Sequence, residues 1–354
     1  MTRLTGITRI SCLVLALSGC GPLVAQPLPP PHVFMKGMTE AGYTTDVFDN
    51  PTIGPELHRM RNDGVDWLSI QLGWYQNTDT SVHIFPDRKE TPTDSSLIHL
   101  IRLAHRMGMR VFLDPFVNAN QGNAWQAVFQ PRLVSQWFAS YDQYLIHYAK
   151  IAQAQHVDLM AIGDEFDSLD AVPAYKPYWD HAVALVHRYY HGPVTYGADY
   201  VHYSEVTFWN QLNVVGLDAY FPLSTNPNPS TAILASSWFS LANQIESWRV
   251  SSGLSHKPFL VTELGYFSGH GVAAEPGTWL PSSPVDLALQ ARLYRATFES
   301  LYREPWLSGL FWFWWANPSN PNWQRGPHDN GYTPRGKPAE RVLKRCFTGV
   351  RHPF

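Results

Sequence analysis

The chain has 354 residues, of which 45% are hydrophobic and 16% are charged, so it is long enough to bury a large core and too apolar for extended disorder. The net charge of −3 offers no basic excess to neutralise phosphates, which argues against a nucleic acid as partner. Aromatic residues make up 14% of the chain; most of them are expected in the core, but flat rings also stack on sugars, so an aromatic-lined carbohydrate cleft is a second interpretation.

Residues 1–19 have the features of a bacterial lipoprotein signal peptide. Arg3 and Arg9 precede the apolar run ISCLVLAL, which is too short to span a bilayer. The ending LSGC resembles a lipobox, in which cleavage leaves Cys20 to carry lipid; a secretory signal with a chance cysteine is the alternative. Residues 20–31 are rich in proline and predict an extended tether. We therefore expect a protein anchored by lipid in the cell envelope, at the periplasmic face or the outer membrane.

The cysteine and histidine content predicts neither a disulfide nor a metal site. If Cys12 leaves with the signal and Cys20 is acylated, only Cys346 remains, and it has no partner within the chain. The 15 histidines show no HExxH motif, and the cysteines show no paired CxxC spacing. No cofactor is expected.

Residues 32–354 alternate between apolar runs of strand length and longer helical patterns. The candidate strands are 33–38, 65–74, 110–116, 158–165, 193–199, 214–220, 258–266 and 307–315. Helical patterns occupy 94–108, 132–155, 176–190, 230–251 and 285–303. Eight such units predict a single (β/α)8 TIM barrel. A doubly wound open sheet would alternate in the same way, but MKGMTEAGY after the first strand lacks the GxGxxG spacing, so the barrel is favoured.

Two of the predicted strands carry a glutamate near their C-terminal end. Glu165 follows the apolar run LMAIGD, and Glu263 lies in FLVTELGY. Active sites of such barrels lie at the C-terminal ends of the strands, so both side chains are expected to face one cleft. Glycoside hydrolysis needs two carboxyl groups that flank the scissile bond. The alternative is that either glutamate pairs with an arginine at the barrel rim.

The motifs IGDEFDSL, TELGY and GLFWFWW together resemble clan A of the glycoside hydrolases, and within it the β-mannanase-like family 113. MKGMTEAGYTT, YGADY, GLDAYFPL and GKPAERVL extend this resemblance over nearly all of 33–345. It implies that Glu165 is the general acid/base and Glu263 the nucleophile of a retaining glycosidase. Glu263 must then stay ionised, which a hydrogen bond from Tyr220 would favour, whereas Glu165 must hold a proton.

Two departures from the family pattern leave the substrate open. Asp164 stands where the clan commonly has Asn and related families often have Thr, either of which bonds the 2-hydroxyl of the sugar; an Asp accepts such a bond but adds charge. In LDPFVNA, Asp114 replaces a basic residue and Phe116 an imidazole. Asp199 and Asp218, on the fifth and sixth predicted strands, either bind sugar hydroxyls or satisfy backbone donors.

Four tryptophans are candidate platforms for sugar rings. The clan usually keeps a Trp after strand eight, and the resemblance implies Trp315, with Trp314 as the second choice. Trp74, after the second strand, and Trp279, after the seventh, are candidates for outer subsites.

The leading hypothesis is a lipid-anchored retaining glycosidase that cleaves a polysaccharide or oligosaccharide, either a β-1,4-mannan or glucomannan or a related envelope polysaccharide or exopolysaccharide. A barrel that binds polysaccharide without cleaving it, and assists export or assembly, is the second hypothesis. A metal-dependent hydrolase of other substrates is the third. The presence of both glutamates favours the first.

Overall fold

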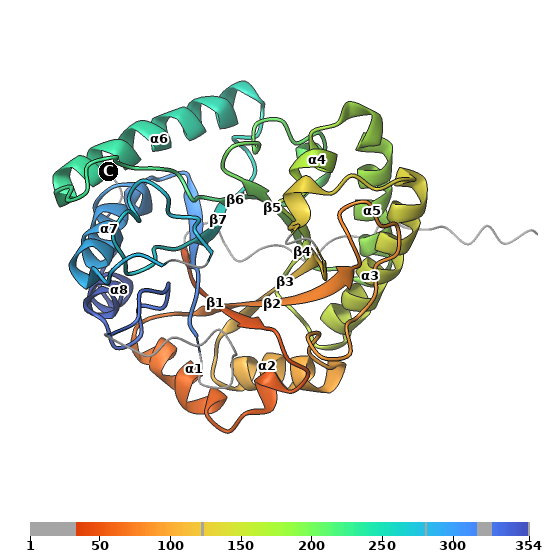
Figure 1. Cartoon of the computed structure of the whole chain (residues 1–354), viewed down its shortest axis with the longest axis horizontal. Coiled ribbons are helices and arrows are strands. Elements are labelled where there is room, and N and C mark those ends of the chain that lie inside the picture. The colour runs from red at the N-terminus through yellow and green to blue at the C-terminus, as the bar shows by residue number, and fades with distance from the viewer. Residues whose placement is uncertain (1–32, 122–123, 280–281, 317–327, 353–354) are drawn as a thin grey trace, which may run out of the picture.

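The computed structural model describes residues 33–121, 124–279, 282–316 and 328–352. The predicted signal peptide and tether, including Cys20, lie outside this part of the chain. Eight parallel strands close into a barrel in chain order, with β1 paired to β8. They are β1 Met35–Gly42, β2 Trp67–Gln76, β3 Arg110–Ala119, β4 Leu159–Asp164, β5 Val194–Asp199, β6 Val215–Asp218, β7 Phe259–Leu264 and β8 Leu307–Trp312. The predicted (β/α)8 barrel is confirmed (Figure 1).

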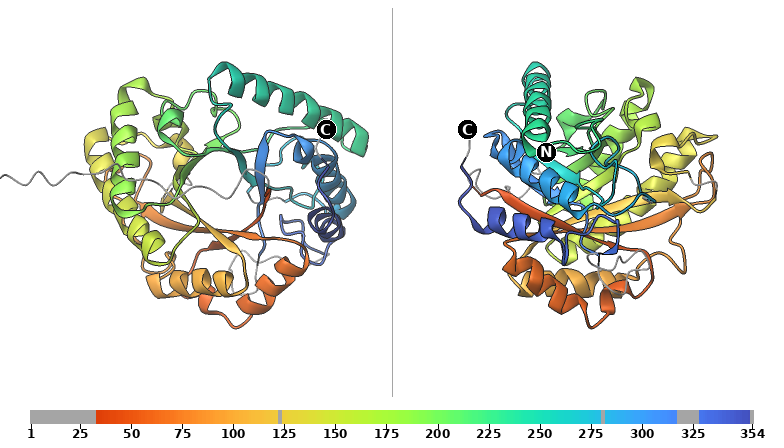
Figure 2. Two further views of the ribbon diagram at one scale, coloured as in Figure 1. Left: turned by 180° about the vertical axis from the view of Figure 1, so that it is seen from behind. Right: turned by 60° about the vertical axis from the view of Figure 1, so that its left-hand side comes forward.

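The helices form one layer outside the strands, as Figures 1 and 2 show. They are α1 Ile53–Asn62, α2 Asp94–Arg106, α3 Val134–Ala154, the short α4 Asp167–Asp170, α5 Lys176–Tyr189, α6 Thr231–Ser251, α7 Leu287–Glu299 and α8 Pro338–Thr348. Short 3-10 helices lie at Val47–Asp49, Gln126–Val128, Pro173–Tyr175, Trp209–Gln211 and Leu301–Arg303. Among the described residues, none of the helices is both long enough and apolar enough to cross a membrane.

The five helices predicted from periodicity are present within a few residues of their expected bounds. Side chains at three of their N-termini accept hydrogen bonds from backbone N–H groups: Thr93, Ser230 and Asp286. Sequence patterning did not predict α1 or α8. Both are short and carry many charged residues, as in IGPELHRMRN, and each buries only three apolar side chains, which are too few to reveal a helical period in the sequence.

The interior of the barrel changes from apolar to acidic along the strands. Toward the N-terminal ends of the strands, the interior is filled by a small buried apolar cluster: Met35, Trp67, Phe112, Leu159, Ala161, Val214, Leu260 and Phe311. Side chains of a strand alternate between its two faces, so Asp114 lies on the same face of β3 as Phe112. Asp218, at the C-terminal end of β6, is likewise completely buried. Carboxyl groups therefore follow the apolar layer toward the C-terminal ends of the strands.

The predicted strand 307–315 is shorter in the structure, because β8 ends at Trp312. Beyond it the N–H groups of Phe313 and Trp315 still donate to the carbonyls of Leu264 on β7 and Thr39 on β1, over 2.8 and 2.7 Å, but the strand is no longer regular, and the peptide bond between Phe313 and Trp314 is cis. The aromatic residues of GLFWFWW consequently do not follow a strand alternation beyond Trp312, which matters for the predicted sugar platforms.

Candidate active site

Five carboxyl groups from four strands and the loop after one of them gather at the C-terminal end of the barrel: Asp114, Asp164, Glu165, Asp218 and Glu263. Asp164, Asp218 and Glu263 each place one oxygen within 4.8 Å of the other two. Glu165 lies near enough to Glu263 for that charge to raise its pKa. The strand ends thus bring the two predicted catalytic glutamates into one acidic cluster.

Glu263, on β7, is held by hydrogen bonds to both carboxylate oxygens. The Tyr220 hydroxyl donates to Oε2 over 2.7 Å, as predicted, and Gln71 Nε2 donates to Oε1. Only 8% of the residue is exposed, and burial raises its pKa, while these two hydrogen bonds lower it. The two donors stabilise the ionised form of Glu263, and its small exposed surface leaves the carboxylate accessible to a substrate, as a nucleophile requires.

Glu165 lies one residue beyond β4, in a constrained turn. Its φ is +47°, in the left-handed region that residues with a side chain seldom adopt, and its N–H donates to the Gly197 carbonyl over 2.8 Å. The next N–H, that of Phe166, donates to the Tyr196 hydroxyl over 2.6 Å. These two bonds stabilise the turn that directs Glu165 away from the ladder.

The environment of Glu165 favours the protonated form of its side chain. Burial and the surrounding carboxylates, chiefly Asp164 and Glu263, raise its pKa well above the usual range. A protonated carboxyl group beside an ionised one is the arrangement that general acid catalysis of glycoside cleavage requires. Burial raises the pKa of both glutamates, whereas the hydrogen bonds from Tyr220 and Gln71 lower that of Glu263 again.

No arginine or lysine neutralises this cluster within the residues that the structure describes. None of the ion pairs there includes Asp114, Asp164, Glu165, Asp218 or Glu263. The alternative that Glu165 or Glu263 pairs with a rim arginine is thus contradicted for the described residues.

The three aspartates predicted to bind substrate lie in different settings. Asp199, at the end of β5, accepts the backbone N–H of Val201 over 2.6 Å, which matches the interpretation that it satisfies a backbone donor. Asp164 and Asp218 are buried and face each other above Gly197. Asp164 also accepts a hydrogen bond from Gln126 Nε2 over 3.1 Å.

Trp279 and Trp314 belong to one aromatic cluster at this end of the barrel. The Trp279 ring lies 6.1 Å from the rings of Trp314, Phe313 and Tyr43, centroid to centroid. Trp279 is 44% exposed, whereas Trp314 is almost completely covered. The open face of Trp279 lies where a polymer could stack on it.

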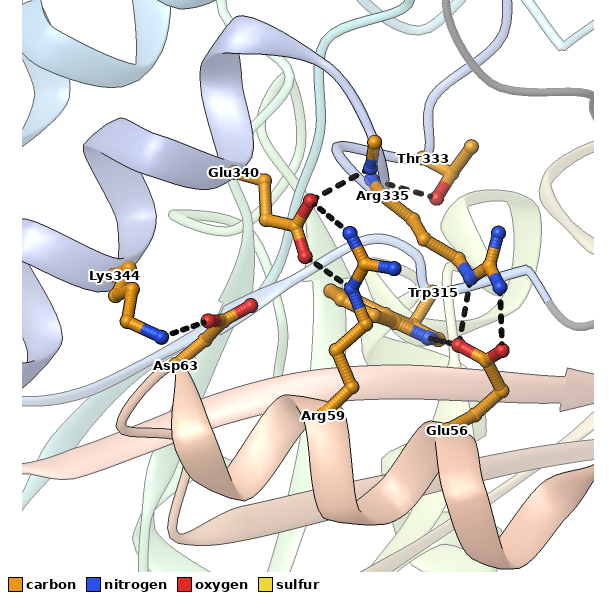
Figure 3. A network of polar contacts seen from close by, with 9 residues as sticks. Glu56, Arg59, Asp63, Trp315, Thr333, Arg335, Glu340 and Lys344 are labelled. Carbon is orange, nitrogen blue, oxygen red and sulfur yellow. Dashed lines mark hydrogen bonds and ion pairs between the residues drawn. The ribbon is translucent and has the colours of Figure 1, made fainter.

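Trp315 lies elsewhere, against α1 (Figure 3). It is fully buried, and its indole N–H donates to Glu56 over 2.9 Å. Arg335 donates two hydrogen bonds of 2.7 Å to the same carboxylate, and the Arg59 guanidinium lies 6.0 Å from the Trp315 ring centre. This polar network gives Trp315 a structural environment and leaves its ring no free face.

Trp74 is also directed away from the carboxyl cluster. Its ring packs on α3, 5.7 Å from Tyr144, 5.2 Å from His147 and 6.1 Å from Tyr148. Because strand residues alternate, Trp74 faces outward where Gln71 faces the barrel interior. The structure therefore does not bring Trp74 and Trp315 together with the other candidates.

Three residues of the site were missed by sequence reasoning: Gln71, Gln126 and Tyr332. Gln71 had a signal, since it is a large polar residue on the inward face of a buried strand. Burial raises the pKa of Tyr332, and the charges of Glu263 and Glu165 raise it further. This tyrosine donates to the carbonyls of Pro276 and Thr278 and thereby holds the segment that precedes Trp279. Nothing in the local sequence distinguishes Tyr332 or Gln126.

Replacing Tyr220 with phenylalanine is expected to lower kcat/KM by about ten- to a hundredfold, because a hydrogen bond to a charged carboxylate contributes about 1.5–3 kcal/mol. Loss of this donor also raises the pKa of Glu263, so the acidic limb of the pH profile should move to higher pH. Steady-state kinetics across pH measure both effects, with the exposed Tyr189 replaced by phenylalanine as control. An unchanged acidic limb would refute the role given to this bond.

Protein stability is expected to fall as pH rises from about 4 toward 8. Burial raises the pKa of Asp114 and of Asp167 to about 8, whereas an unfolded Asp titrates near about 3.9. In this interval the folded state keeps protons that the unfolded chain releases, so the free energy of unfolding decreases by about 1.4 kcal/mol per pH unit for each such group. Denaturant unfolding should show a shallower pH slope for Asp114→Asn than for the wild type. Equal slopes, with Asp180→Asn as surface control, would contradict this assignment.

Comparisons with known proteins agree with this geometry. The sequence matches the family model of Glycoside Hydrolase Family 113 over residues 41–337. A solved family 113 β-1,4-mannanase is 26% identical and superimposes with a TM-score of 0.79 over 90% of this chain and 100% of its own. The family 113 β-mannanase AaManA from Alicyclobacillus acidocaldarius, solved in complex with ManMIm, is 23% identical with a TM-score of 0.78, covering 89% and 97% of the two chains.

More distant structures share the fold alone. A β-glucuronidase from an uncultured Clostridium species is 14% identical with a TM-score of 0.60, over 90% of this chain and 51% of its own. A search of curated proteins gave no match. The family match covers most of the chain, including both catalytic candidates and the whole acidic cluster. The chain is therefore a glycosidase and belongs to glycoside hydrolase family 113.

Proposed function

We propose that this glycosidase cleaves a β-linked polysaccharide with retention of configuration, by a double displacement on two glutamates. The observation that carries the proposal is the different environment of the two groups. Glu263 is fixed by donors on both oxygens, while burial and the surrounding carboxylates raise the pKa of Glu165. A β-1,4-mannan or glucomannan is the first candidate substrate, because solved relatives are β-1,4-mannanases. A related envelope polysaccharide or exopolysaccharide is the alternative.

In the first step, Glu263 attacks the anomeric carbon, and Glu165 gives its proton to the departing glycosidic oxygen. The bond between the anomeric carbon and that oxygen breaks, and an ester between the sugar and Glu263 forms. In the second step, Glu165, now a carboxylate, takes a proton from water as the water attacks the same carbon. Glu263 leaves as a carboxylate, and the enzyme returns to its starting protonation state.

Sugar binding is assigned to groups on both sides of this pair. To Asp164, which is next to Glu165 and has an oxygen within 4.8 Å of one of Glu263, we assign a hydrogen bond from a hydroxyl beside the anomeric carbon. Trp279 offers an exposed ring for an outer subsite, and Trp314 lies beneath it. Asp199 acts through the backbone of its loop and is given no direct contact.

For location, we propose a lipid anchor on Cys20 that holds the barrel in the bacterial cell envelope. The support is the sequence alone: a basic start, a short apolar run, LSGC and a Pro-rich tether. Metabolic labelling with a radioactive fatty acid should mark the wild-type protein and not Cys20→Ala. Equal labelling of both would remove the anchor from this account.

The substrate is tested by reducing-end release from mannans, glucomannans, β-glucans, galactans and envelope polysaccharides, with wild type and Glu263→Ala side by side. Release by the wild type alone supports the proposal and identifies the polymer. A barrel that only binds polysaccharide is not favoured by the family match or by the intact pair of glutamates. Retention of one polymer with no release from any would favour that second hypothesis.

A further inference from the structure

The two buried aspartates of the cluster meet over a glycine. Asp164 on β4 and Asp218 on β6 lie on either side of β5, where Gly197 pairs with Asp164. A Cβ atom on residue 197 would lie 2.9 Å from Asp164 Oδ1 and 2.6 Å from Asp218 Oδ2. The missing side chain of Gly197 thus leaves the space in which two carboxyl groups from non-adjacent strands meet.

The hydrogen bonds of this pair account for only half of its oxygens. Asp164 Oδ2 accepts from Gln126 Nε2 over 3.1 Å, and Asp218 Oδ1 accepts from Thr262 Oγ1 over 2.7 Å. Asp218 Oδ2 is buried, and no N–H or hydroxyl of the described residues donates to it. It faces Asp164 Oδ1 above Gly197, so the remaining partner of each oxygen is the other carboxyl group.

We propose that Asp164 and Asp218 share one proton, and that Asp218 is a positioning residue that holds Asp164, and with it the adjacent Glu165, in the catalytic geometry. Two carboxylates are acceptors only, so they attract each other only when one of them is protonated. Asp218 is completely buried and accepts from a single donor among the described residues, so we assign the proton to it. Asp164 is then the ionised member of the pair, and its slightly exposed carboxylate remains able to accept a hydrogen bond from the substrate.

The groups around the pair favour this protonation. The ionisable side chains that face it from the neighbouring elements are acids or neutral phenols: Tyr43, Asp114, Tyr141, Tyr144, Glu165, Asp167 and Glu263. Burial and these carboxylates raise the pKa of both aspartates well above the usual range. In the described part of the chain, neither aspartate forms an ion pair with a basic residue.

A cation is the competing explanation, because Asp164, Asp218 and Glu263 present oxygens close enough together to bind one. Both Glu263 oxygens already accept hydrogen bonds from Tyr220 and Gln71, which leaves a poor donor set for a metal ion. A shared proton satisfies the two unpaired oxygens without a further ligand. The two explanations make opposite predictions for an amide at residue 218.

The test compares Asp218→Asn with Asp218→Ala. In the amide variant the oxygen still accepts from Thr262, and the NH2 group donates permanently to Asp164. We expect kcat/KM of Asp218→Asn within about threefold of the wild type, and a loss of at least about tenfold in Asp218→Ala. Equal losses in the two variants would overturn the proposal, as would a loss of wild-type activity on treatment with EDTA that added Ca²⁺ or Mg²⁺ restores.

A spectroscopic measurement tests the proton without relying on activity. The infrared difference spectrum of wild type minus Asp218→Asn at neutral pH should contain the carbonyl band of one protonated carboxylic acid, and wild type minus Asp164→Asn should as well. Absence of the band from both spectra would overturn the proposal, and it would do so even if Asp218→Ala failed to fold. The kinetic comparison of the Asp218 variants rests on the proposed function. If the wild type cleaves no polymer, the proposed function fails, but the infrared spectra still show whether the two aspartates share a proton.

Discussion

Replacing Glu263 with alanine is expected to lower kcat by at least about 10⁴-fold on any polymer that the wild type cleaves, because the nucleophile of a double displacement has no substitute in the site. Glu165 remains able to protonate the leaving group, and the shortened side chain leaves a space beside the anomeric carbon. Azide should therefore restore part of the activity and give an α-glycosyl azide, since it attacks from the side that Glu263 occupied. Reducing-end release and product analysis measure the two effects.

The matched control is Glu299→Ala, which removes an exposed glutamate from α7 on the outside of the barrel. Its kcat should equal that of the wild type. Activity of Glu263→Ala within tenfold of the wild type would show that another group attacks the sugar. A circular dichroism spectrum and melting temperature close to those of the wild type are needed to attribute the loss to chemistry.

Replacing Glu165 with alanine is expected to lower kcat/KM on polysaccharide by about 10²- to 10⁴-fold, the usual contribution of a general acid. Aryl β-glycosides whose phenol has a low pKa should lose much less in the first step, because a phenolate departs without a proton. Hydrolysis of the glycosyl-enzyme also needs Glu165 as base, so azide should accelerate turnover and yield a β-glycosyl azide. Product configuration thus distinguishes the roles of Glu165 and Glu263.

Equal losses on polymer and on activated aryl glycoside would contradict the role of Glu165 as acid. The alkaline limb of the pH profile is a second measurement. The neighbouring carboxylates raise the pKa of Glu165, so the wild type should retain activity to a pH well above the usual range of a glutamate. That limb should disappear in Glu165→Ala.

The barrel and the acidic pair were predictable because both depend on local patterns. Alternating apolar runs and helical periods gave the strand and helix order, and the strand ends located Glu165 and Glu263. The hydrogen bond from Tyr220 followed from the position of that residue just after β6. These features need only the rule that the C-terminal strand ends of a barrel face one cleft.

The remaining parts of the site depend on side-chain directions that the sequence does not encode locally. Trp315 follows a strand that ends at Trp312, and its indole is fixed by Glu56, a residue of α1 far away in sequence. Trp74 was a candidate for an outer subsite, yet its ring packs on α3. The meeting of Asp164 and Asp218 required the absence of a side chain on Gly197, a condition set by three strands together.

The most direct test of the two-glutamate mechanism is the anomeric configuration of the first product, followed by proton NMR during cleavage of the preferred β-linked oligosaccharide. A double displacement through Glu263 predicts that the β-anomer of the new reducing end appears first and then mutarotates to the equilibrium mixture. Initial appearance of the α-anomer would mean a single displacement by water and would contradict the role assigned to Glu263.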